Sequence, residues 1–282
     1  MNILPTILIL GGGEYASAIA FYLWRSCLPV VMAIHESEFH LRRPICFAEA
    51  VIDGKKKIEQ VLAISLNEKQ LGNFNGISYQ ENWKKAVHFE IDNKNIPIFL
   101  NTDLSNFLEV LEPSIIVKGI DRYFREVQID DASLVIGLYP FHQIEKECHV
   151  AVETRQNYWI GSVYTSKPLT TPDFDHQLFR QSFQEVQTPI EGVFITQKEI
   201  GQIINHNEAF GKIDGVEIRS PYNGQIWGLF HSGRIIQAKE PLALIYEGKK
   251  SDAFKHFGYQ HKIVAGTVLR ECLNFLNLPS TY

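Results

Sequence analysis

Residues 6–17 read TILILGGGEYAS, and this stretch decides the fold of the front half of the chain. A short apolar run, Thr6–Leu10, is followed at once by three glycines. Helix-forming and aromatic residues then continue without a breaker from Glu14 to Arg25. This order predicts a strand, a glycine turn and a helix, which is the opening unit of a doubly wound α/β fold.

The glycine turn has the form Gly11-x-Gly13-x-x-Ala16. The first glycine permits a sharp turn, the second allows a phosphate to approach the backbone, and the small alanine allows close helix–sheet packing. The helix N-terminus offers free amides to an anion. A second apolar run, Pro29–Ile34, ends about 20 residues past the turn, where such folds place an acid that binds ribose. The candidate cofactor-binding residues are therefore Gly11, Gly12, Gly13, Ala16 and Glu36.

A second interpretation of the same turn stays open. In a degenerate Rossmann-like scaffold the glycines would serve packing alone. Glu14 follows the glycines directly and would repel an anion if its side chain pointed inward. The turn thus predicts either a phosphate site or a packing element.

Alternating strands and helices predict a mostly parallel sheet with helices on both faces. Pro97 lies near the start of one strand and predicts an edge position or a late start for it, because proline cannot donate to a ladder. The polar stretches 54–57 and 67–85 are expected to be surface excursions. The further strands are expected at 96–100, 115–117 and 133–138, and a helix at 103–111.

Residues 188–213 and 220–245 are two copies of one pattern, superimposable at an offset of 32 residues without a gap. Each copy reads as a turn, a β-rich run, a glycine turn, a second apolar run and a closing strand. One such unit is too small to bury its own apolar face, but two copies bury each other. Between the copies, Asp214-Gly215 predicts a tight hairpin. The matched residues are Pro189, Gly192, Gly201, Ile203, Ile204, Glu208 and Ile213 with Pro221, Gly224, Gly233, Ile235, Ile236, Glu240 and Ile245.

This β module, residues 188–248, resembles the barrel-sandwich hybrid of biotinyl and lipoyl carrier domains, in which the strands of two halves interlock around one small core. Those carriers hold a modifiable lysine at the tip of the hairpin that joins the halves. Here Lys212 lies before the turn, so the resemblance implies a rigid module for docking or assembly rather than a swinging-arm carrier.

The composition indicates a globular protein with two domains. The chain has 282 residues, of which 45% are hydrophobic and 12% aromatic. A net charge of -5 gives no general basic field, so we expect no nucleic-acid binding and no membrane binding. Apolar runs fall short of the roughly 18 to 20 residues that cross a bilayer, and no basic segment precedes the first one. A cytoplasmic location is expected.

Polar residues near the middle of the chain form a second candidate site. Strand alternation would put His149 and Glu153 on one face, as acid–base or metal chemistry would need, with Thr154 directly after them. A buried structural His–Glu hydrogen bond fits the same spacing. No third ligand is evident and the four cysteines are scattered, so no metal and no disulfide framework is expected.

The pattern predicts four segments. These are a Rossmann-like domain over 1–170, a linker over 171–187, the β module over 188–248, and a C-terminal helical segment over 249–282 that packs back on the first domain.

Six segments of the chain, taken in order, resemble one family, the selenium-dependent molybdenum hydroxylase accessory proteins, relatives of the xanthine dehydrogenase accessory (XdhC-like) factors. The similarity spans nearly the whole chain, and the order and spacing of the segments carry it. The segments are Leu10–Ser17, Leu41–Pro44 with Phe47–Val51, Leu134–Leu138, His149–Thr154, Pro189–Phe194 and Ala265–Leu269.

The resemblance implies a maturation factor that helps a client molybdenum hydroxylase acquire its finished cofactor. The front domain would handle a nucleotide or the pterin of the molybdenum cofactor (molybdopterin). By this resemblance the glycines and Ala16 match the phosphate-type loop, Glu36 the acid after the second strand, and Arg42 and Arg43 a basic pair. Forked guanidinium donors suit a phosphate, although a solvated basic turn fits the same residues.

The chain departs from the family at two loops. Tyr139-Pro140-Phe141-His142 stands where the family has Gly-Pro-Gly-Phe, and Arg155-Gln156-Asn157-Tyr158 stands where it has an Arg-Gly-His segment. Side chains now occupy positions where backbone could have approached a ligand. Two other functions therefore stay open. One is an NAD(P)-dependent oxidoreductase, for which no Tyr-x-x-x-Lys set is present, and the other is a non-catalytic scaffold, with homo-oligomer formation undecided.

Overall fold

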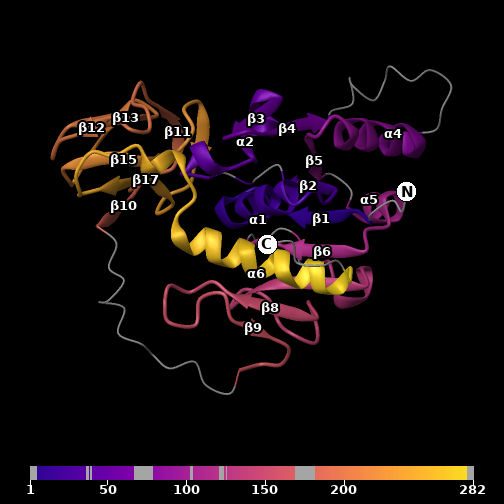
Figure 1. The fold of residues 1–282 in the computed structure, drawn as a ribbon. Helices are drawn as coiled ribbons and strands as arrows, with labels where there is room; N and C mark the ends of the chain where they lie inside the picture. The colour runs from indigo at the N-terminus through magenta and orange to yellow at the C-terminus, as the bar shows by residue number, and fades with distance from the viewer. Residues whose placement is uncertain are drawn as a thin grey trace. The chain divides into compact units, whose positions relative to one another are not determined.

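The computed structural model describes residues 5–35, 38, 40–66, 79–101, 104–120, 124, 126–168 and 182–277. The chain forms two compact units. The first unit contains residues 1–38, 46–176 and 257–282, and the second contains residues 39–45 and 177–256 (Figure 1). The chain therefore leaves the first unit twice and returns to it for its last segment.

The first unit is built on a mostly parallel sheet. Its described strands are β1 (Ile7–Leu10), β2 (Val30–His35), β3 (Lys55–Ile58), β4 (Val61–Leu66), β5 (Ile96–Asn101), β6 (Ile115–Lys118), β7 (Leu134–Tyr139), β8 (Val150–Glu153) and β9 (Val163–Tyr164). Their order is β3-β4-β5-β2-β1-β6-β7-β8-β9, and all neighbours pair in parallel except β3 with β4 and β8 with β9 at the two edges. The predicted mostly parallel α/β sheet is confirmed.

The order of the inner strands locates a switch point. The series β5-β2-β1-β6-β7-β8 follows the doubly wound pattern, in which the direction of strand addition reverses between β1 and β6. Ligands of such sheets bind in the crevice outside the carboxyl ends of the strands at this reversal. The fold thus directs attention to the ends of β1, β6 and β7.

Helices cover both faces of this sheet. The described helices of the unit are α1 (Glu14–Arg25), α2 (Glu49–Asp53), α4 (Tyr79–Asp92), α5 (Leu104–Leu111) and α6 (Tyr259–Phe275). Leu8 and Leu10 of β1 share a buried cluster with Trp83 of α4 and Leu108 of α5, so these two helices cover one face. The alternate residues of β1 are also fully buried, because the other face is covered as well.

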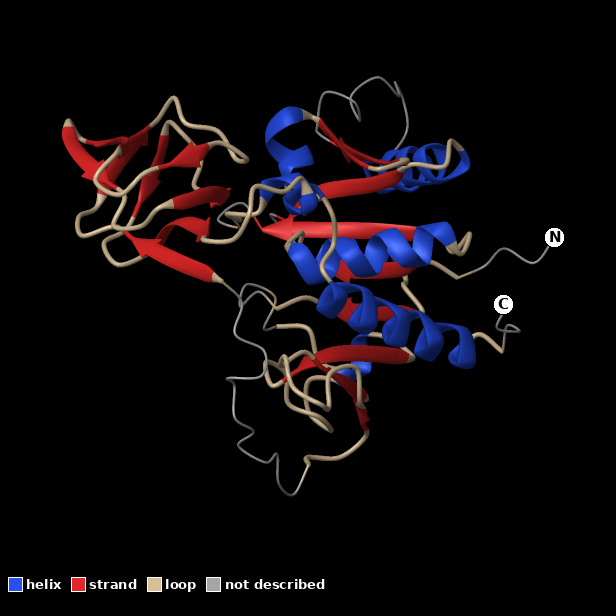
Figure 2. Ribbon diagram, turned by 60° about the vertical axis from the view of Figure 1, so that its left-hand side comes forward, coloured by secondary structure: helices blue, strands red, loops and turns tan. Residues whose placement is uncertain are grey.

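The C-terminal helix packs beside the first helix. Figure 2 shows α6 running alongside α1, and the two make extensive contact. Phe257, just before α6, meets Phe21 of α1 edge-on, with ring centroids 5.5 Å apart. On α6 the buried residues Val264, Ala265 and Val268 recur at helical spacing, which explains why the sequence pattern of a helix is visible here.

The structure corrects three expectations for the first unit. β5 lies inside the sheet and starts at Ile96, so Pro97 marks neither an edge nor a late start. Its ladder with β2 begins only at Ile98, so the missing N–H breaks no bond on that side. Residues 55–58 form edge strand β3, and α4 begins at Tyr79, where surface excursions were predicted.

The second unit contains two antiparallel sheets of four strands. Their orders are β10-β17-β15-β12 and β14-β13-β11-β16. The bounds are β10 (Phe183–Gln187), β11 (Gly192–Ile195), β12 (Ile203–Ile204), β13 (Ala209–Ile213), β14 (Val216–Arg219), β15 (Gly224–Leu229), β16 (Arg234–Ile236) and β17 (Pro241–Tyr246). The 32-residue offset maps β11, β12 and β13 onto β15, β16 and β17.

The two repeat copies exchange their middle strands. β12 of the first copy pairs with β15 of the second, while β16 of the second pairs with β11 of the first. Phe194 and Ile213 from one copy and Ile226 and Ile245 from the other share one core. Each copy therefore completes the sheet of the other, which is why one copy alone could not fold. The finer barrel-sandwich assignment stays a prediction.

The predicted hairpin between the copies is confirmed. Asp214 and Gly215 have φ angles of 45° and 87°, and they join β13 to β14 through the pair Ile213 and Val216. Positive φ at both central residues is the type I′ pattern, which matches the twist of two antiparallel strands. The Asp214 carboxylate also accepts a hydrogen bond from Val193 N at 3.0 Å.

Two segments of the second unit were not foreseen. Residues 183–187 were assigned to the linker but form β10, which pairs with β17. Only Val186 is buried in β10, so this edge strand shows no apolar alternation. Residues 39–45 also belong to this unit, because Leu229 N donates to Leu41 O at 2.9 Å and Arg43 Nε donates to Leu229 O at 3.0 Å.

Candidate functional site

The glycine turn sits between β1 and α1 and is closely packed. Gly11 has φ 95°, a left-handed conformation that favours glycine. A Cβ on Gly12 would lie 2.6 Å from Ile34 Cδ1 and 2.7 Å from Ala48 Cβ, so this position also requires glycine. Gly12 O accepts hydrogen bonds from Ala48 N at 3.2 Å and from Ser17 Oγ at 2.8 Å. The segment that contains Ala48 therefore closes one side of the turn.

One amide of the turn is bonded to a carboxylate of the chain. Gly12 N donates to Glu38 Oε1 at 2.6 Å, and Glu38 is only 7% exposed. Sequence reasoning selected Glu36, which lies outside the described residues, and missed Glu38. The strand pattern that ends at His35 gives no signal for Glu38, whose N donates to His35 O at 3.0 Å, a bond between residues three apart. An internal carboxylate thus holds a donor that a phosphate would use.

The N-terminus of α1 remains without a side-chain cap. Gly13 is the N-cap residue, with φ -68° and ψ -175°, and it contributes no side-chain hydrogen bond. Ala16 is buried in the first turn, as its small size allows. Amides at such a helix end are available to an anion, and the helix dipole favours negative charge there.

Glu14 is held by a histidine of α6. Its Oε2 lies 3.1 Å from His261 Nε2, and His261 Nδ1 accepts from Gly258 N at 3.1 Å. Neutral His261 therefore carries its proton on Nε2 and donates it to Glu14. Tyr15 meets the His261 ring edge-on and donates to Thr154 O at 3.1 Å, while burial raises the pKa of the Tyr15 hydroxyl.

The structure does not bring His149 and Glu153 together. His149 stands before β8, where its Nδ1 accepts from Val135 N at 2.9 Å, whereas Glu153 ends β8 opposite Tyr139. Neither the catalytic pairing nor the structural His–Glu bond forms between them. Strand alternation predicts that the two side chains share a face, but His149 precedes β8 and Glu153 is its last residue, so they lie at opposite ends of the strand.

Glu153 instead forms an ion pair with the partly exposed Arg155. It is fully buried, and its carboxylate accepts from Arg155 Nε at 3.0 Å, Arg155 Nη2 at 2.7 Å and Tyr164 Oη at 3.3 Å. The hydrogen bond to Glu153 raises the pKa of Arg155, and burial raises the pKa of Tyr164. Thr154 Oγ1 donates to Tyr139 O at 2.8 Å. These contacts join the ends of β7, β8 and β9 and leave no free acid–base pair among them.

Arg42 and Arg43 belong to the second unit. Arg43 Nε donates to Leu229 O, and Arg43 Nη1 lies 3.4 Å from His231 Nδ1. Arg42 is buried. The guanidinium of Arg43 therefore helps to hold the segment 39–45 on β15.

A cavity of about 570 Å³ opens at the carboxyl ends of β1, β6 and β7. Its lining includes Leu10, Lys118, Phe124, Phe141 and His142. This is the switch point of the sheet, where ligands of doubly wound folds bind. No motif in the sequence marked these residues as a group, because they come from three separate strand ends.

Lys118 is the cation of this cavity. It ends β6, is only 2% exposed, and its Nζ donates to Val127 O at 2.7 Å. Within the described part of the chain, no carboxylate lies within ion-pair distance of this ammonium. Burial lowers the pKa of Lys118, and the negative charge of Glu147 opposes that effect.

His142 supplies a neutral donor beside Lys118. Its Nδ1 accepts from Leu138 N at 3.0 Å, so neutral His142 carries its proton on Nε2. Burial, reinforced by the charge of Lys118, lowers the pKa of His142 to about 4. The nearby thiol of Cys148 is inert, because burial raises its pKa to about 11.

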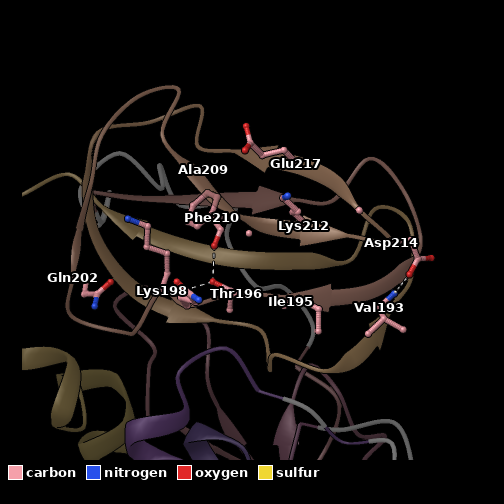
Figure 3. Close-up of a pocket in the computed structure, with 13 residues that line it drawn as sticks. Val193, Ile195, Thr196, Lys198, Gln202, Ala209, Phe210, Lys212, Asp214 and Glu217 are labelled. Carbon is pink, nitrogen blue, oxygen red and sulfur yellow. Dashed lines mark hydrogen bonds between the residues drawn. The ribbon is translucent and has the colours of Figure 1, made fainter.

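The second unit carries a shallower cavity of about 710 Å³ on one sheet (Figure 3). Figure 3 shows Val193 and Ile195 on one strand, Lys212 on the neighbouring strand, and Asp214 at the hairpin end, where it accepts from Val193 N. Ile195 is 54% exposed, and Val193 pairs across the strands with the exposed Ile235. An apolar strip thus lies open on this sheet.

The described ranges contain neither a membrane-spanning helix nor a metal-binding cluster. No helix there has the length and apolar character needed to cross a membrane. No group of three or more His, Cys, Asp or Glu side chains in those ranges is arranged to hold a metal ion.

The chain was compared with known proteins. No family model matches it. It is similar to an uncharacterized protein of Escherichia coli strain K12, YqeB, at 25% identity over 275 residues. That match covers 96% of this chain and 48% of the relative, so the chain spans about half the length of that protein. Among solved structures it is similar to the product-bound ectoine utilization protein EutE (DoeB) from Ruegeria pomeroyi, at 11% identity and a TM-score of 0.24, over 86% of this chain and 85% of that chain.

Proposed function

We propose that this protein is an accessory factor in the maturation of a molybdenum hydroxylase and that its first unit binds a phosphate-bearing ligand. The single observation that supports ligand binding is the glycine turn with an uncapped helix N-terminus at the switch point of a doubly wound sheet. The maturation role rests on the six ordered segments that resemble the accessory family. The ligand in this proposal is a nucleotide or the pterin of the molybdenum cofactor.

The residues at the turn fit a phosphate, provided that Glu38 releases the amide of Gly12. Gly12 N is bonded to Glu38, so a phosphate that uses this amide must replace that carboxylate. A hydrogen bond to a charged group contributes about 1.5–3 kcal/mol, which a doubly charged phosphate can offset by reaching several amides of the turn. Ligand binding would then release Glu38.

The second unit is proposed as the client-binding module. The strand exchange between its copies supports a rigid barrel-sandwich-type module, since each copy completes the other. Its open apolar strip at Val193, Ile195 and Ile235 supplies contact area of the kind that protein partners bury.

Complementation tests the maturation role. Cells that lack this chain and contain molybdenum hydroxylases would receive the parent, Gly13→Asp or Gly13→Asn. Both variants can cap α1, but only aspartate adds a negative charge at the anion site. We expect the parent and the asparagine variant to restore hydroxylase activity and the aspartate variant to fail. Full hydroxylase activity in cells without the chain would contradict the proposal.

A second candidate is an NAD(P)-dependent oxidoreductase, which the doubly wound strand order favours. It requires a bound dinucleotide and a proton donor beside the nicotinamide. The measurement that separates the two is the mass of the ligand that the protein retains, because a dinucleotide and a pterin differ in mass.

A further inference from the structure

The cavity at the ends of β6 and β7 is built differently from the glycine turn. Leu10 lines it, and Gly119 N donates to Leu10 O at 2.8 Å, so it adjoins the end of β1 on the β6 side. Its lining includes the polar side chains of Lys118, His142, Gln143 and Glu147. Its volume of about 570 Å³ lies within the range of roughly 300–1,000 Å³ that small-molecule sites occupy.

The charges in this cavity are not balanced within the described residues. The buried ammonium of Lys118 has a backbone carbonyl as its hydrogen-bond partner, at 2.7 Å. A buried charge without a paired opposite charge is costly. The nearest acid of the lining, Glu147, accepts from Gln143 N at 2.6 Å and stands outside ion-pair distance of Lys118.

The second polar group of the cavity is a donor that carries no charge. His142 Nδ1 accepts a hydrogen bond from Leu138 N, so the Nε2 proton is the donor that His142 has for a ligand. An ammonium and a neutral N–H that line the same cavity suit the oxygens of one anionic group. Phe124 and Phe141 add apolar lining for the rest of a ligand.

We propose that this cavity binds the oxyanion group of a small, partly apolar ligand, with Lys118 as the cation and His142 as the neutral donor. The shared chemistry is that of a carboxylate or a phosphate ester. The site is separate from the phosphate position at the glycine turn and does not depend on the maturation role.

Reductive labelling tests the site on the parent chain of 282 residues. Formaldehyde carries no anionic group, and it forms an imine with an unprotonated lysine with loss of water; borohydride then reduces the imine to a stable methylated amine. Peptide mapping compares Lys118 with Lys146, an exposed lysine. We expect Lys118 to be labelled at least several-fold faster at pH 7.5 and to be protected by inorganic phosphate or by benzoate.

The two competitors distinguish the sources of the oxyanion, since phosphate protects a phosphate site and benzoate an apolar carboxylate site. Labelling of Lys118 no faster than Lys146, or labelling that neither competitor slows, overturns the proposal. Because the glycine turn is not needed for this reaction, its result is independent of the complementation experiment.

A matched variant tests the donor role of the histidine. His142→Asn keeps an acceptor for Leu138 N but removes the Nε2 proton. We expect the competitor concentration that half-protects Lys118 to rise about fivefold to tenfold, the effect of one lost hydrogen bond. An unchanged protection curve in a folded variant overturns the assignment of His142.

Discussion

The glycine turn and the Lys118 cavity lie at the same edge of one sheet but balance charge in different ways. At the turn, the donors are backbone amides, and the chain supplies its own carboxylate at 2.6 Å from Gly12 N. In the cavity, the donors are an ammonium and an imidazole, and no described carboxylate pairs with the ammonium. One amide of the turn is therefore satisfied without a ligand, whereas under our proposal the charge of the cavity is balanced by a ligand. The two anion sites thus differ in whether the chain itself supplies a carboxylate.

The largest expected effect concerns the pH dependence of stability through His142. Its folded pKa of about 4 lies below the unfolded value near 6.5, so between these pH values the unfolded chain binds a proton that the folded chain does not. The contribution of His142 to the free energy of unfolding is fully present above pH 6.5. It decreases by about 3 kcal/mol as the pH falls to about 4. Urea unfolding across this range should show a smaller loss for His142→Asn. If the free energy of unfolding of parent and variant changed with pH in parallel, the electrostatic description of the cavity would be wrong.

A smaller change in stability is expected when the turn is overpacked. Gly12→Ala would place a Cβ 2.9 Å from the backbone Cα of Ala48, which cannot move without shifting its segment. The free energy of unfolding should fall by about 1–3 kcal/mol. Gly266→Ala is the control, because a Cβ there meets nothing within 4 Å and alanine favours a helix interior by about 0.5–1 kcal/mol. Equal stability of the two variants in denaturant titration would show that the turn is loosely packed.

Removing the internal carboxylate should open the turn to anions. Glu38→Gln keeps an acceptor for Gly12 N but removes the negative charge, so the affinity for inorganic pyrophosphate should rise about tenfold, or ~1.4 kcal/mol. Isothermal titration calorimetry measures this. Glu14→Gln removes a charge that His261 already holds and should change the affinity less. Equal gains in both variants would mean that only net charge matters.

The smallest effect is expected at the mouth of the cavity. Phe141 is exposed, so Phe141→Ala should change stability by no more than about 0.5 kcal/mol. It should nevertheless weaken protection of Lys118 by benzoate about twofold to threefold, because apolar lining is lost. Protection by phosphate should change less. A stability loss of several kcal/mol would contradict the exposed position of this ring.

The sequence predicted most of the parts of the fold that bury regular apolar patterns, although strand β4, which is also largely buried, was not predicted. Thr6–Leu10 with its glycines, the repeated copies and the Asp214-Gly215 hairpin all have local signals that the structure retains. Strands β3 and β10 were missed because each is a polar edge strand with a single buried residue, Ile58 or Val186. Such strands exist through pairing with a neighbour, which local patterns do not report.

The candidate site was less accessible to sequence reasoning. Ala16 was predicted to need a small residue and is buried, but the close packing at Gly12, an unspecified position of the motif, was not predicted, and the acid at the turn is Glu38 and not a residue that the motif names. Lys118 ends an apolar run and looks like the solvated end of a strand. Its place in a candidate site is visible only in the structure, where Lys118 is buried and lines the same cavity as His142.

Native mass spectrometry tests the central claim, that the first unit binds a phosphate-bearing ligand at the end of β1, most directly. The parent, Gly13→Asp and Gly13→Asn would be purified from cells that make molybdenum cofactor. The account predicts one added ligand mass, a pterin under the maturation proposal, in the parent and the asparagine variant and its loss in the aspartate variant. A dinucleotide mass in its place would favour the oxidoreductase. No added mass in the parent, or the same mass in the aspartate variant, would contradict the claim.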